Sequence, residues 1–202
     1  MKKLSYTVLI LFIVLQSSNA QIIEPRMTLK NEFYSAYGFA SLQEIGVGFA
    51  EGLASVLSFG TLQTNDHVAG PIIVGYKRNI DMNFTVGLMA SYTGIESEWK
   101  KTNSNLLLST NHEDFYTLMT RFDIVYVTNK WVQMYSGLSV GCTNWKSDIS
   151  YTDTTKGHQF NEFHIAAHVN VFGLRVENKI GGFFELGFGY NGIINLGITY
   201  KF

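Results

Sequence analysis

The last nine residues of the chain, Ile194-Asn-Leu-Gly-Ile-Thr-Tyr-Lys-Phe202, alternate between two kinds of side chain. Successive side chains of a β-strand point to opposite faces of the sheet, so every second residue shares a face. One face of this segment is apolar or aromatic throughout: Ile194, Leu196, Ile198, Tyr200 and Phe202. The other face is polar or small: Asn195, Gly197, Thr199 and Lys201. The segment therefore predicts a strand whose two faces lie in different surroundings.

The segment just before it repeats the pattern. Residues 182–190 place Phe184, Leu186, Phe188 and Tyr190 on one face, with Glu185, Gly187 and Gly189 on the other. Only Asn191-Gly-Ile193 separates the two segments, and Asn-Gly is a dipeptide typical of tight turns. The two segments together predict a β-hairpin.

Six further strands are predicted upstream by the same alternation. They cover 32–40, 69–78, 83–96, 113–128, 131–145 and 161–176. Most of these segments exceed the mean of about 5 to 6 residues for strands of soluble sheets. After residue 20 no run of about 18 apolar residues occurs, so only strands could carry this chain across a membrane.

The predicted connections alternate in length. Those at 79–82, 129–130 and 177–181 are short, whereas 41–68, 97–112 and 146–160 are long, and the final one at 191–193 is short again. Bacterial outer-membrane barrels have short periplasmic turns and longer external loops. An even number of strands would place both chain ends on the periplasmic side.

The composition excludes several classes of protein. Charged residues make up 15% of the 202-residue chain, against about 25% in a typical soluble domain. In their place stand 19 Gly, 15 Phe and 11 Tyr, and the formal net charge is -1. A disordered chain, a coiled coil and a basic nucleic-acid-binding protein are excluded. The single cysteine, Cys142, excludes a disulfide framework and a thiolate zinc site.

The first 20 residues predict export. Lys2 and Lys3 precede an unbroken apolar run from Val8 to Leu15, and Ser18 and Ala20 occupy the small-residue positions before a cleavage point. This is the pattern of a secretory signal peptide. We expect residues 1–20 to be removed and residues 21–202 to form the mature domain.

Two eight-stranded architectures fit these observations. A soluble barrel of the lipocalin or streptavidin type would bury its apolar face, whereas a membrane barrel would turn that face outward. An eight-stranded barrel has an interior just wide enough for side chains, so the glycine-rich face of the last two strands fits inside. The fold predicted is all-β: an eight-stranded antiparallel up-and-down transmembrane barrel.

Specific motifs point to a family. The terminal Leu196-Gly-Ile-Thr-Tyr-Lys-Phe202 resembles the C-terminal signal that the assembly machinery recognises in bacterial outer-membrane proteins. The last hairpin, 183–202, and Gly70-Pro-Ile-Ile-Val-Gly-Tyr-Lys77 are similar to small barrel proteins common in Bacteroidetes. The resemblance implies outer-membrane localisation, contact with outer-membrane lipid, and assembly through Tyr200 and Phe202. It implies very little about chemistry.

Charged residues are predicted on inward-facing positions. They are Lys77, Arg121, Asp123, Glu185 and Lys201. Charges inside a narrow barrel must be paired or hydrated, because isolated burial is costly. Two interpretations remain: a polar path for small solutes, or a plug of ion pairs that closes the lumen.

The sequence predicts no catalytic, cofactor or metal site. Gly187-Phe-Gly-Tyr-Asn-Gly192 matches a dinucleotide fingerprint, but no helix or distant acid follows it. His67, His112 and His158 fall in three long connections, where solvated residues are the simpler interpretation. His112, Glu113 and Asp114 could serve acid–base chemistry in a lipid-modifying hydrolase, but no partnered nucleophile is evident.

One helix is predicted within the first long connection. Between residues 42 and 59, Leu42, Ile45, Phe49, Leu53 and Val56 recur at helical spacing. This amphipathic segment could cap the barrel, lie on the outer leaflet or bind a partner. We expect a non-enzymatic protein acting through its external loops in binding, adhesion or envelope structure. The alternatives are a narrow pore for small solutes and a lipid-modifying hydrolase.

Overall fold

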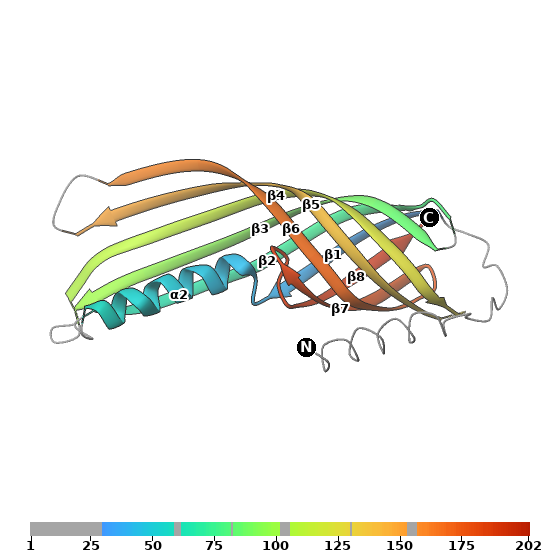
Figure 1. Ribbon diagram of the computed structural model, residues 1–202, viewed down its shortest axis with the longest axis horizontal. Coiled ribbons are helices and arrows are strands. Elements are labelled where there is room, and N and C mark those ends of the chain that lie inside the picture. Colours follow the sequence, from blue (N-terminus) through green and yellow to red (C-terminus); the bar gives the residue numbers. More distant parts are fainter. Residues whose placement is uncertain (1–29, 59–61, 82, 102–105, 130, 153–156) are drawn as a thin grey trace, which may run out of the picture.

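The computed structural model describes residues 30–58, 62–81, 83–101, 106–129, 131–152 and 157–202. Its elements, in chain order, are β1 (Asn31–Phe39), α2 (Leu42–Leu57), β2 (Leu62–Asn79), β3 (Phe84–Lys101), β4 (Leu106–Thr128), β5 (Val132–Tyr151), β6 (His158–Glu177), β7 (Ile180–Gly189) and β8 (Ile194–Lys201). The strands form one antiparallel sheet that closes on itself in the order β1 to β8 (Figure 1). The predicted eight-stranded up-and-down barrel is confirmed.

The barrel closes between its first and last strands. Glu32 faces Lys201 and Phe39 faces Ile194 along the β1–β8 register. The Asn31 N–H donates to the Phe202 carbonyl over 3.2 Å, and the Phe202 N–H donates to the Asn31 carbonyl over 2.9 Å. We call this end of the barrel, where β2, β4 and β6 end and β3, β5 and β7 begin, the near end. The opposite end is the far end.

The outward face of the barrel is apolar. Large side chains exposed there come from all the strands and include Phe33, Val74, Leu88, Phe122, Leu138, Ile165, Phe188 and Ile198. A soluble barrel would bury such side chains to keep them from water. Their exposed positions favour the membrane interpretation over the lipocalin-like one.

Aromatic side chains bound this apolar belt at both ends. At the near end, the rings of Phe33 and Phe202 lie 5.3 Å apart and those of Tyr200 and Phe202 lie 5.9 Å apart. At the far end, the rings of Tyr92 and Tyr116 lie 5.3 Å apart, and Tyr37 packs against Phe39. Two aromatic girdles flanking an apolar band are typical of outer-membrane barrels.

Five strands continue well past the far end. The strands β1, β7 and β8 have 9, 10 and 8 residues, whereas β2 to β6 have 18, 18, 23, 20 and 20. We call residues 62–69, 93–101, 106–115, 143–151 and 158–164, together with α2, the extension. It forms a long curved sheet beyond the closed barrel (Figure 1).

The prediction that 97–112 and 146–160 are loops was wrong. Most of these residues continue the strands, since they pair with neighbours such as Ser97 with Asn111 and Ser147 with Phe160. The pairing satisfies their backbone N–H and C=O groups and lets polar residues remain in a sheet. The connection at 41–68 contains α2, which confirms the helix predicted over 42–59, and the start of β2, which begins at Leu62 rather than at residue 69.

The helix α2 begins at a capping box. The Glu44 N–H donates to the Ser41 hydroxyl, and the Ser41 N–H donates to the Glu44 carboxylate, both over 3.3 Å. Such a reciprocal pair satisfies two backbone donors at the start of a helix. The helix then runs beside β2 along the extension, so it lines the side of the extension rather than capping the barrel (Figure 1).

The predicted signal peptide, residues 1–20, lies outside the described residues. Within the described residues, no helix is both long and apolar enough to span a membrane.

Candidate functional site

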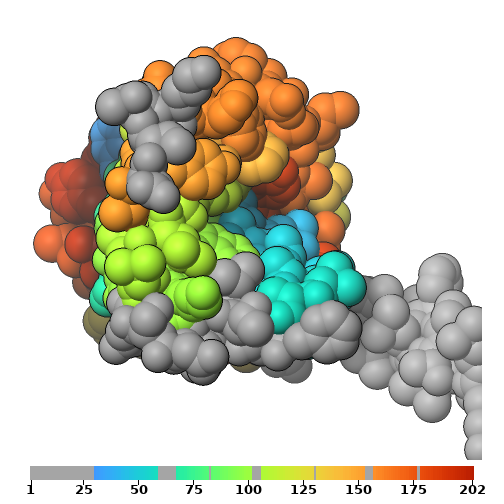
Figure 2. Space-filling view, turned by 90° about the vertical axis from the view of Figure 1, so that its left-hand side faces the viewer, coloured from blue at the N-terminus to red at the C-terminus, as the bar shows by residue number. Residues whose placement is uncertain are grey.

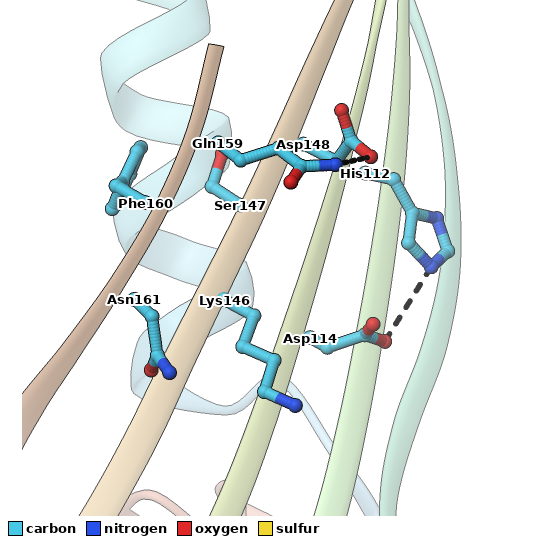
Figure 3. A pocket seen from close by; sticks show the side chains of 8 residues that line it. All are labelled: His112, Asp114, Lys146, Ser147, Asp148, Gln159, Phe160 and Asn161. Atoms are coloured by element: carbon cyan, nitrogen blue, oxygen red, sulfur yellow. Dashed lines mark hydrogen bonds and ion pairs between the residues drawn. The ribbon is translucent and has the colours of Figure 1, made fainter.

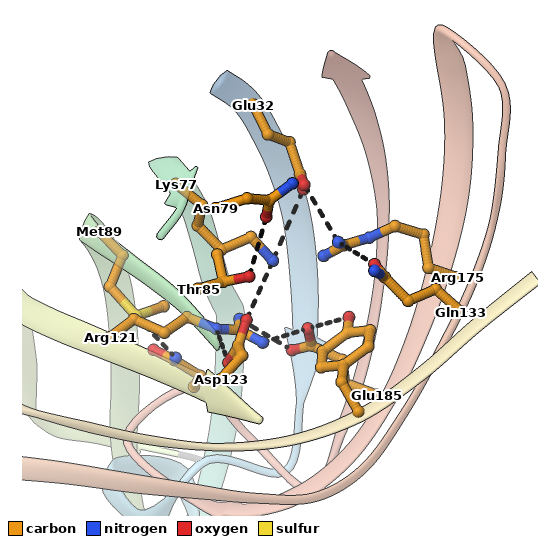
Figure 4. Close-up of polar contacts among 12 residues, drawn as sticks. Glu32, Lys77, Asn79, Thr85, Met89, Arg121, Asp123, Gln133, Arg175 and Glu185 are labelled. Carbon is orange, nitrogen blue, oxygen red and sulfur yellow. Dashed lines mark hydrogen bonds and ion pairs between the residues drawn. The ribbon is translucent and has the colours of Figure 1, made fainter. Parts of the chain in front are cut away.

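Ion pairs fill the near half of the barrel. Lys77 Nζ lies 3.5 Å from Glu32 Oε1 and 3.2 Å from Asp123 Oδ2. Arg121 Nε contacts Asp123 Oδ1 at 2.7 Å, and its Nη2 contacts Glu185 Oε1 at 2.6 Å (Figure 4). These five side chains are between 1% and 3% exposed. The pairs therefore form one continuous chain that crosses the barrel interior.

Two residues of this series of ion pairs, Glu32 and Arg175, were not predicted from the sequence. Arg175 Nη1 lies 3.0 Å from Glu32 Oε2 and donates to Gln133 Oε1 at 3.0 Å. Glu32 shares the face of Tyr34, so the alternation of β1 could have revealed it. Arg175 was hidden by a register shift in β6 between Asn170 and Phe172, because one extra residue reverses the alternation that follows.

With Glu32 and Arg175 included, the series of ion pairs in the lumen contains three carboxylates and three cations. Four of the five predicted residues belong to it: Lys77, Arg121, Asp123 and Glu185. The fifth, Lys201, is 9% exposed and lies opposite Glu32 in the β1–β8 register. We call the six residues Glu32, Lys77, Arg121, Asp123, Arg175 and Glu185 the lumen network.

Aromatic rings close the space around the lumen network. The Tyr135 hydroxyl donates to Glu185 Oε1 at 2.6 Å, and Tyr135 is 1% exposed. The Arg175 guanidinium lies 4.7 Å from the centre of the Tyr135 ring, and Lys77 Nζ lies 4.9 Å from the centre of the Tyr34 ring. Each cation therefore contacts an aromatic face as well as a carboxylate, which adds cation–π attraction to the ion pairs.

Glycines make room for these large side chains. A Cβ added at Gly75 would meet the Tyr34 ring, and one added at Gly173 would meet the Tyr135 ring. At Gly137 an added Cβ would meet the Asp123 carboxylate. The narrow interior thus holds the lumen network only because neighbouring strand positions lack side chains.

An apolar layer lies beside the lumen network. Ile73, Met89, Met119 and Ala166 are buried, each at most 2% exposed, and pack with Tyr34 in one core cluster. Methionine side chains adapt to irregular gaps between other groups. The described lumen is therefore filled by two layers of side chains, one ionic and one apolar.

The concave face of the extension carries a second cluster. Its inward-facing residues Ile95, Glu113, Phe115, Trp145 and Phe160 come from β3, β4, β5 and β6. We call this face the trough. Seen from the far end, it is a hollow between β3–β4 (green), β6 (orange) and α2 (cyan) (Figure 2).

Aromatic rings form a wall of the trough. The rings of Phe115 and Trp145 stack at 5.7 Å with an interplanar angle of 10°. Phe160 packs edge-on against Trp145 at 4.8 Å, and the His164 ring lies 5.8 Å away. Such a wall offers apolar area and aromatic faces to a ligand.

Acidic groups accompany these rings. Glu113 is buried, its carboxylate accepts a hydrogen bond from Asn111 Nδ2 at 2.7 Å, and burial raises the pKa of its carboxyl above the usual value. Glu162 pairs with His164 at 3.3 Å and is more exposed. Among the described inward positions of the extension, Lys101 at the end of β3 is the one Lys or Arg, so the charged groups beside the aromatic wall are mainly acidic.

The convex face of the extension has a shallow hollow of about 370 Å³. His112 Nε2 lies 3.4 Å from Asp114, and Gln159 donates to Asp148 over 2.9 Å, with Lys146 nearby (Figure 3). The adjacent Ser147 points to the other face and donates to Asn111 Oδ1 over 3.1 Å. The geometry therefore does not place this hydroxyl as a nucleophile beside His112.

The remaining predicted residues are widely separated. His67, His112 and His158 lie in β2, β4 and β6. Among the described residues, no group of three or more His, Cys, Asp or Glu side chains could hold a metal ion. Tyr200 and Phe202 point outward at the near end, where both are about 40% exposed.

Comparisons with known proteins concern the fold. No family model and no curated protein sequence matches the chain. Similar solved structures include Ail, the attachment invasion locus protein of Yersinia pestis, at 12% identity and a TM-score of 0.45, covering 86% of this chain and 99% of that one. Ail in complex with the heparin analogue sucrose octasulfate is similar at 11% identity and a TM-score of 0.44, with the same coverage.

Proposed function

We propose that this chain is a non-enzymatic outer-membrane barrel protein of the small Bacteroidetes-like kind, with a closed lumen and an extension that recognises a ligand outside the cell. One observation carries the membrane placement. The exposed apolar belt between two aromatic girdles surrounds an interior of buried ion pairs. Outer-membrane lipid would cover the belt, because water would make its exposure unfavourable.

The orientation follows from the ends of the barrel. The near end holds the short turns and both ends of the described sheet, as periplasmic ends of such barrels do. After export and removal of residues 1–20, the chain would insert from that side. Tyr200 and Phe202 would present the closing strand to the barrel assembly machinery. The extension would then project from the cell surface.

A closed lumen distinguishes this proposal from a pore. Each carboxylate of the lumen network contacts at least one cation, and aromatic rings and methionines fill the adjacent space. Opening a solute path would require separating buried opposite charges, which is strongly unfavourable. The proposed function therefore rests on the outer surfaces of the protein.

The trough is the surface best suited to recognition. Trp145, which stacks on the buried Phe115, supplies an aromatic face, and the buried Glu113 and the exposed Glu162 supply negative charge beside it. Aromatic faces and carboxylates together attract ammonium and guanidinium groups. The ligand class that fits is a basic peptide or protein segment, and recognition of this kind would serve binding or adhesion.

Replacing Trp145 is expected to weaken this binding. Purified protein in uncharged detergent micelles should bind a fluorescent oligolysine peptide, and Trp145→Ala should weaken binding at least about tenfold, the scale of a lost hot spot of about 1.4 kcal/mol. Fluorescence anisotropy provides the measurement. Lys146→Ala, one residue away on the convex face, is the matched control and should bind as the unaltered protein does.

Two results would contradict the trough assignment. One is oligolysine binding that Trp145→Ala leaves unchanged while heat-modifiable gel mobility shows the variant to be folded. The other is a preference for oligoglutamate or sucrose octasulfate over oligolysine, because an acidic trough should repel anions.

A further inference from the structure

The outward face of α2 is entirely apolar. Its exposed residues are Ile45, Gly46, Gly48, Phe49, Ala50, Gly52, Leu53, Val56 and Leu57, and none of them has a polar side chain. Phe49 and Val56 are each 73% exposed. The structure describes α2 in full, so this list is complete for the helix. A surface helix normally turns its apolar face toward the core.

The polar residues of α2 face the sheet instead. Gln43 and Glu51 are the buried residues of the helix, each 6% exposed. Glu44 is engaged in the capping box with Ser41. Glu44 and Glu51 are the only acidic residues of the helix, and α2 contains no Lys or Arg. The outward face is therefore uncharged as well as apolar.

The glycines of this face are not required by the chain's own fold. A Cβ added at Gly46, Gly48 or Gly52 would meet nothing within 4 Å. Their backbone is also not in the left-handed region, which in the described chain contains only Gly189 and Gly192 among the glycines. Each glycine nevertheless destabilises a helix relative to alanine. Small residues at four-residue spacing, as at Gly48 and Gly52, let a second helix approach closely.

We propose that α2 packs against α2 of a second copy of this chain, so that two barrels associate side by side. This inference rests on the proposed outer-membrane placement, because all copies then insert with the same orientation. A two-fold axis must then run along the membrane normal. Since α2 follows the long axis of the barrel (Figure 1), the two helices meet in parallel. An uncharged face can pair with itself without like-charge repulsion.

The available area suits association within a membrane. The five large side chains of the outward face are 43% to 73% exposed. They offer roughly 500 Å² of surface per helix, so a pair of helices would bury roughly 1,000 Å² in total. This total is below the standard range for stable complexes. Contacts of this size are weak in dilute solution. Confinement of both copies to one membrane plane raises their effective concentration and favours the pair.

Cysteine cross-linking in outer membranes tests this contact. The background carries Cys142→Ser, because Cys142 is exposed. Phe49→Cys should form a disulfide-linked species of twice the monomer mass on mild oxidation. Lys146→Cys, on β5 rather than on α2, should remain monomeric. Adding Gly52→Leu to Phe49→Cys should reduce cross-linking at least about tenfold, because the larger side chain blocks close approach while the open space around Gly52 lets the helix itself tolerate it.

Each other outcome overturns the proposal. Cross-linking that Gly52→Leu does not reduce would show that this face is not the contact. A product whose mass is not twice that of the monomer would identify a different protein partner. Quenching of a fluorophore at position 49 by brominated lipid would place the face in the bilayer. Heat-modifiable mobility of every variant on the same gels shows separately whether the barrel itself is inserted and folded.

Discussion

Replacing Arg121 with methionine is expected to lower the free energy of unfolding by about 3 to 5 kcal/mol, the usual cost of leaving buried carboxylates without their cation. Arg121 contacts Glu185 through two nitrogens, at 2.6 and 3.3 Å, and Asp123 at 2.7 Å. Methionine keeps much of the side-chain volume but none of the charge. Urea unfolding of the purified barrel, followed by its heat-modifiable mobility, provides the measurement.

A surface ion pair supplies the matched control. Lys100 Nζ and Glu98 Oε2 are also 2.6 Å apart, but both side chains are about one-third exposed. Lys100→Met should therefore cost less than about 1 kcal/mol. The double variant Arg121→Met/Glu185→Gln should be more stable than Arg121→Met alone, since Asp123 retains Lys77 at 3.2 Å and residue 185 no longer carries charge. Equal effects of Arg121→Met and Lys100→Met would contradict the role assigned to the lumen network.

The unaltered barrel is expected to show no discrete conductance steps in planar bilayers. The paired charges of the lumen network and the adjacent apolar layer with Met89 and Met119 occupy the interior, so a passing ion would have to displace buried side chains. The charge-balanced variant Arg121→Ala/Glu185→Ala removes two long side chains from that interior. The polar space left behind can take up water, but the apolar layer with Met89 and Met119 stays in place, so this variant should also show no steps.

The opposite pattern would support the narrow-pore alternative. In that case the unaltered protein would show discrete steps, and altering Arg121 or Glu185 would abolish them. Protein that has lost heat-modifiable mobility is excluded from the comparison, because misfolded barrels perturb bilayers without forming a defined channel.

The barrel itself could be predicted from sequence because one rule governs all its strands. The lumen is narrow and filled with side chains, and the exterior is apolar. Inward-facing and outward-facing residues must therefore alternate along every strand. The same rule located Lys77, Arg121, Asp123 and Glu185 on inward positions. It failed for Arg175, which follows a bulge after Asn170. The sequence shows that Phe172 and Leu174 break the alternation, but only the pairing with the neighbouring strands shows that residues after the bulge, such as Arg175, turn inward.

The extension was harder to predict for a different physical reason. Its strands carry polar residues on both faces, such as Ser97 and Glu96 on β3, so polarity suggested loops. Only pairing with neighbouring strands, a long-range property, keeps these residues in a sheet. The trough was missed for the same reason, because Phe115 and Trp145 meet only through the β4–β5 register.

The helix could be predicted, but its orientation could not. Helical spacing shows that Ile45, Phe49 and Leu53 share a face. It does not show which face turns toward the protein. Burial of Gln43 and Glu51 shows that α2 is turned with its polar side inward, which leaves the apolar side for a partner.

Surface labelling of intact cells tests the central claim most directly. In the Cys142→Ser background, Asp148→Cys places a thiol on the extension and Lys179→Cys places one in a near-end turn; both sites are exposed. The account predicts that a membrane-impermeant maleimide labels position 148 on intact cells and position 179 only after the outer membrane is broken, with both proteins heat-modifiable in the outer-membrane fraction. Recovery of the protein in the soluble periplasmic fraction, or labelling of position 179 but not 148 on intact cells, would contradict it.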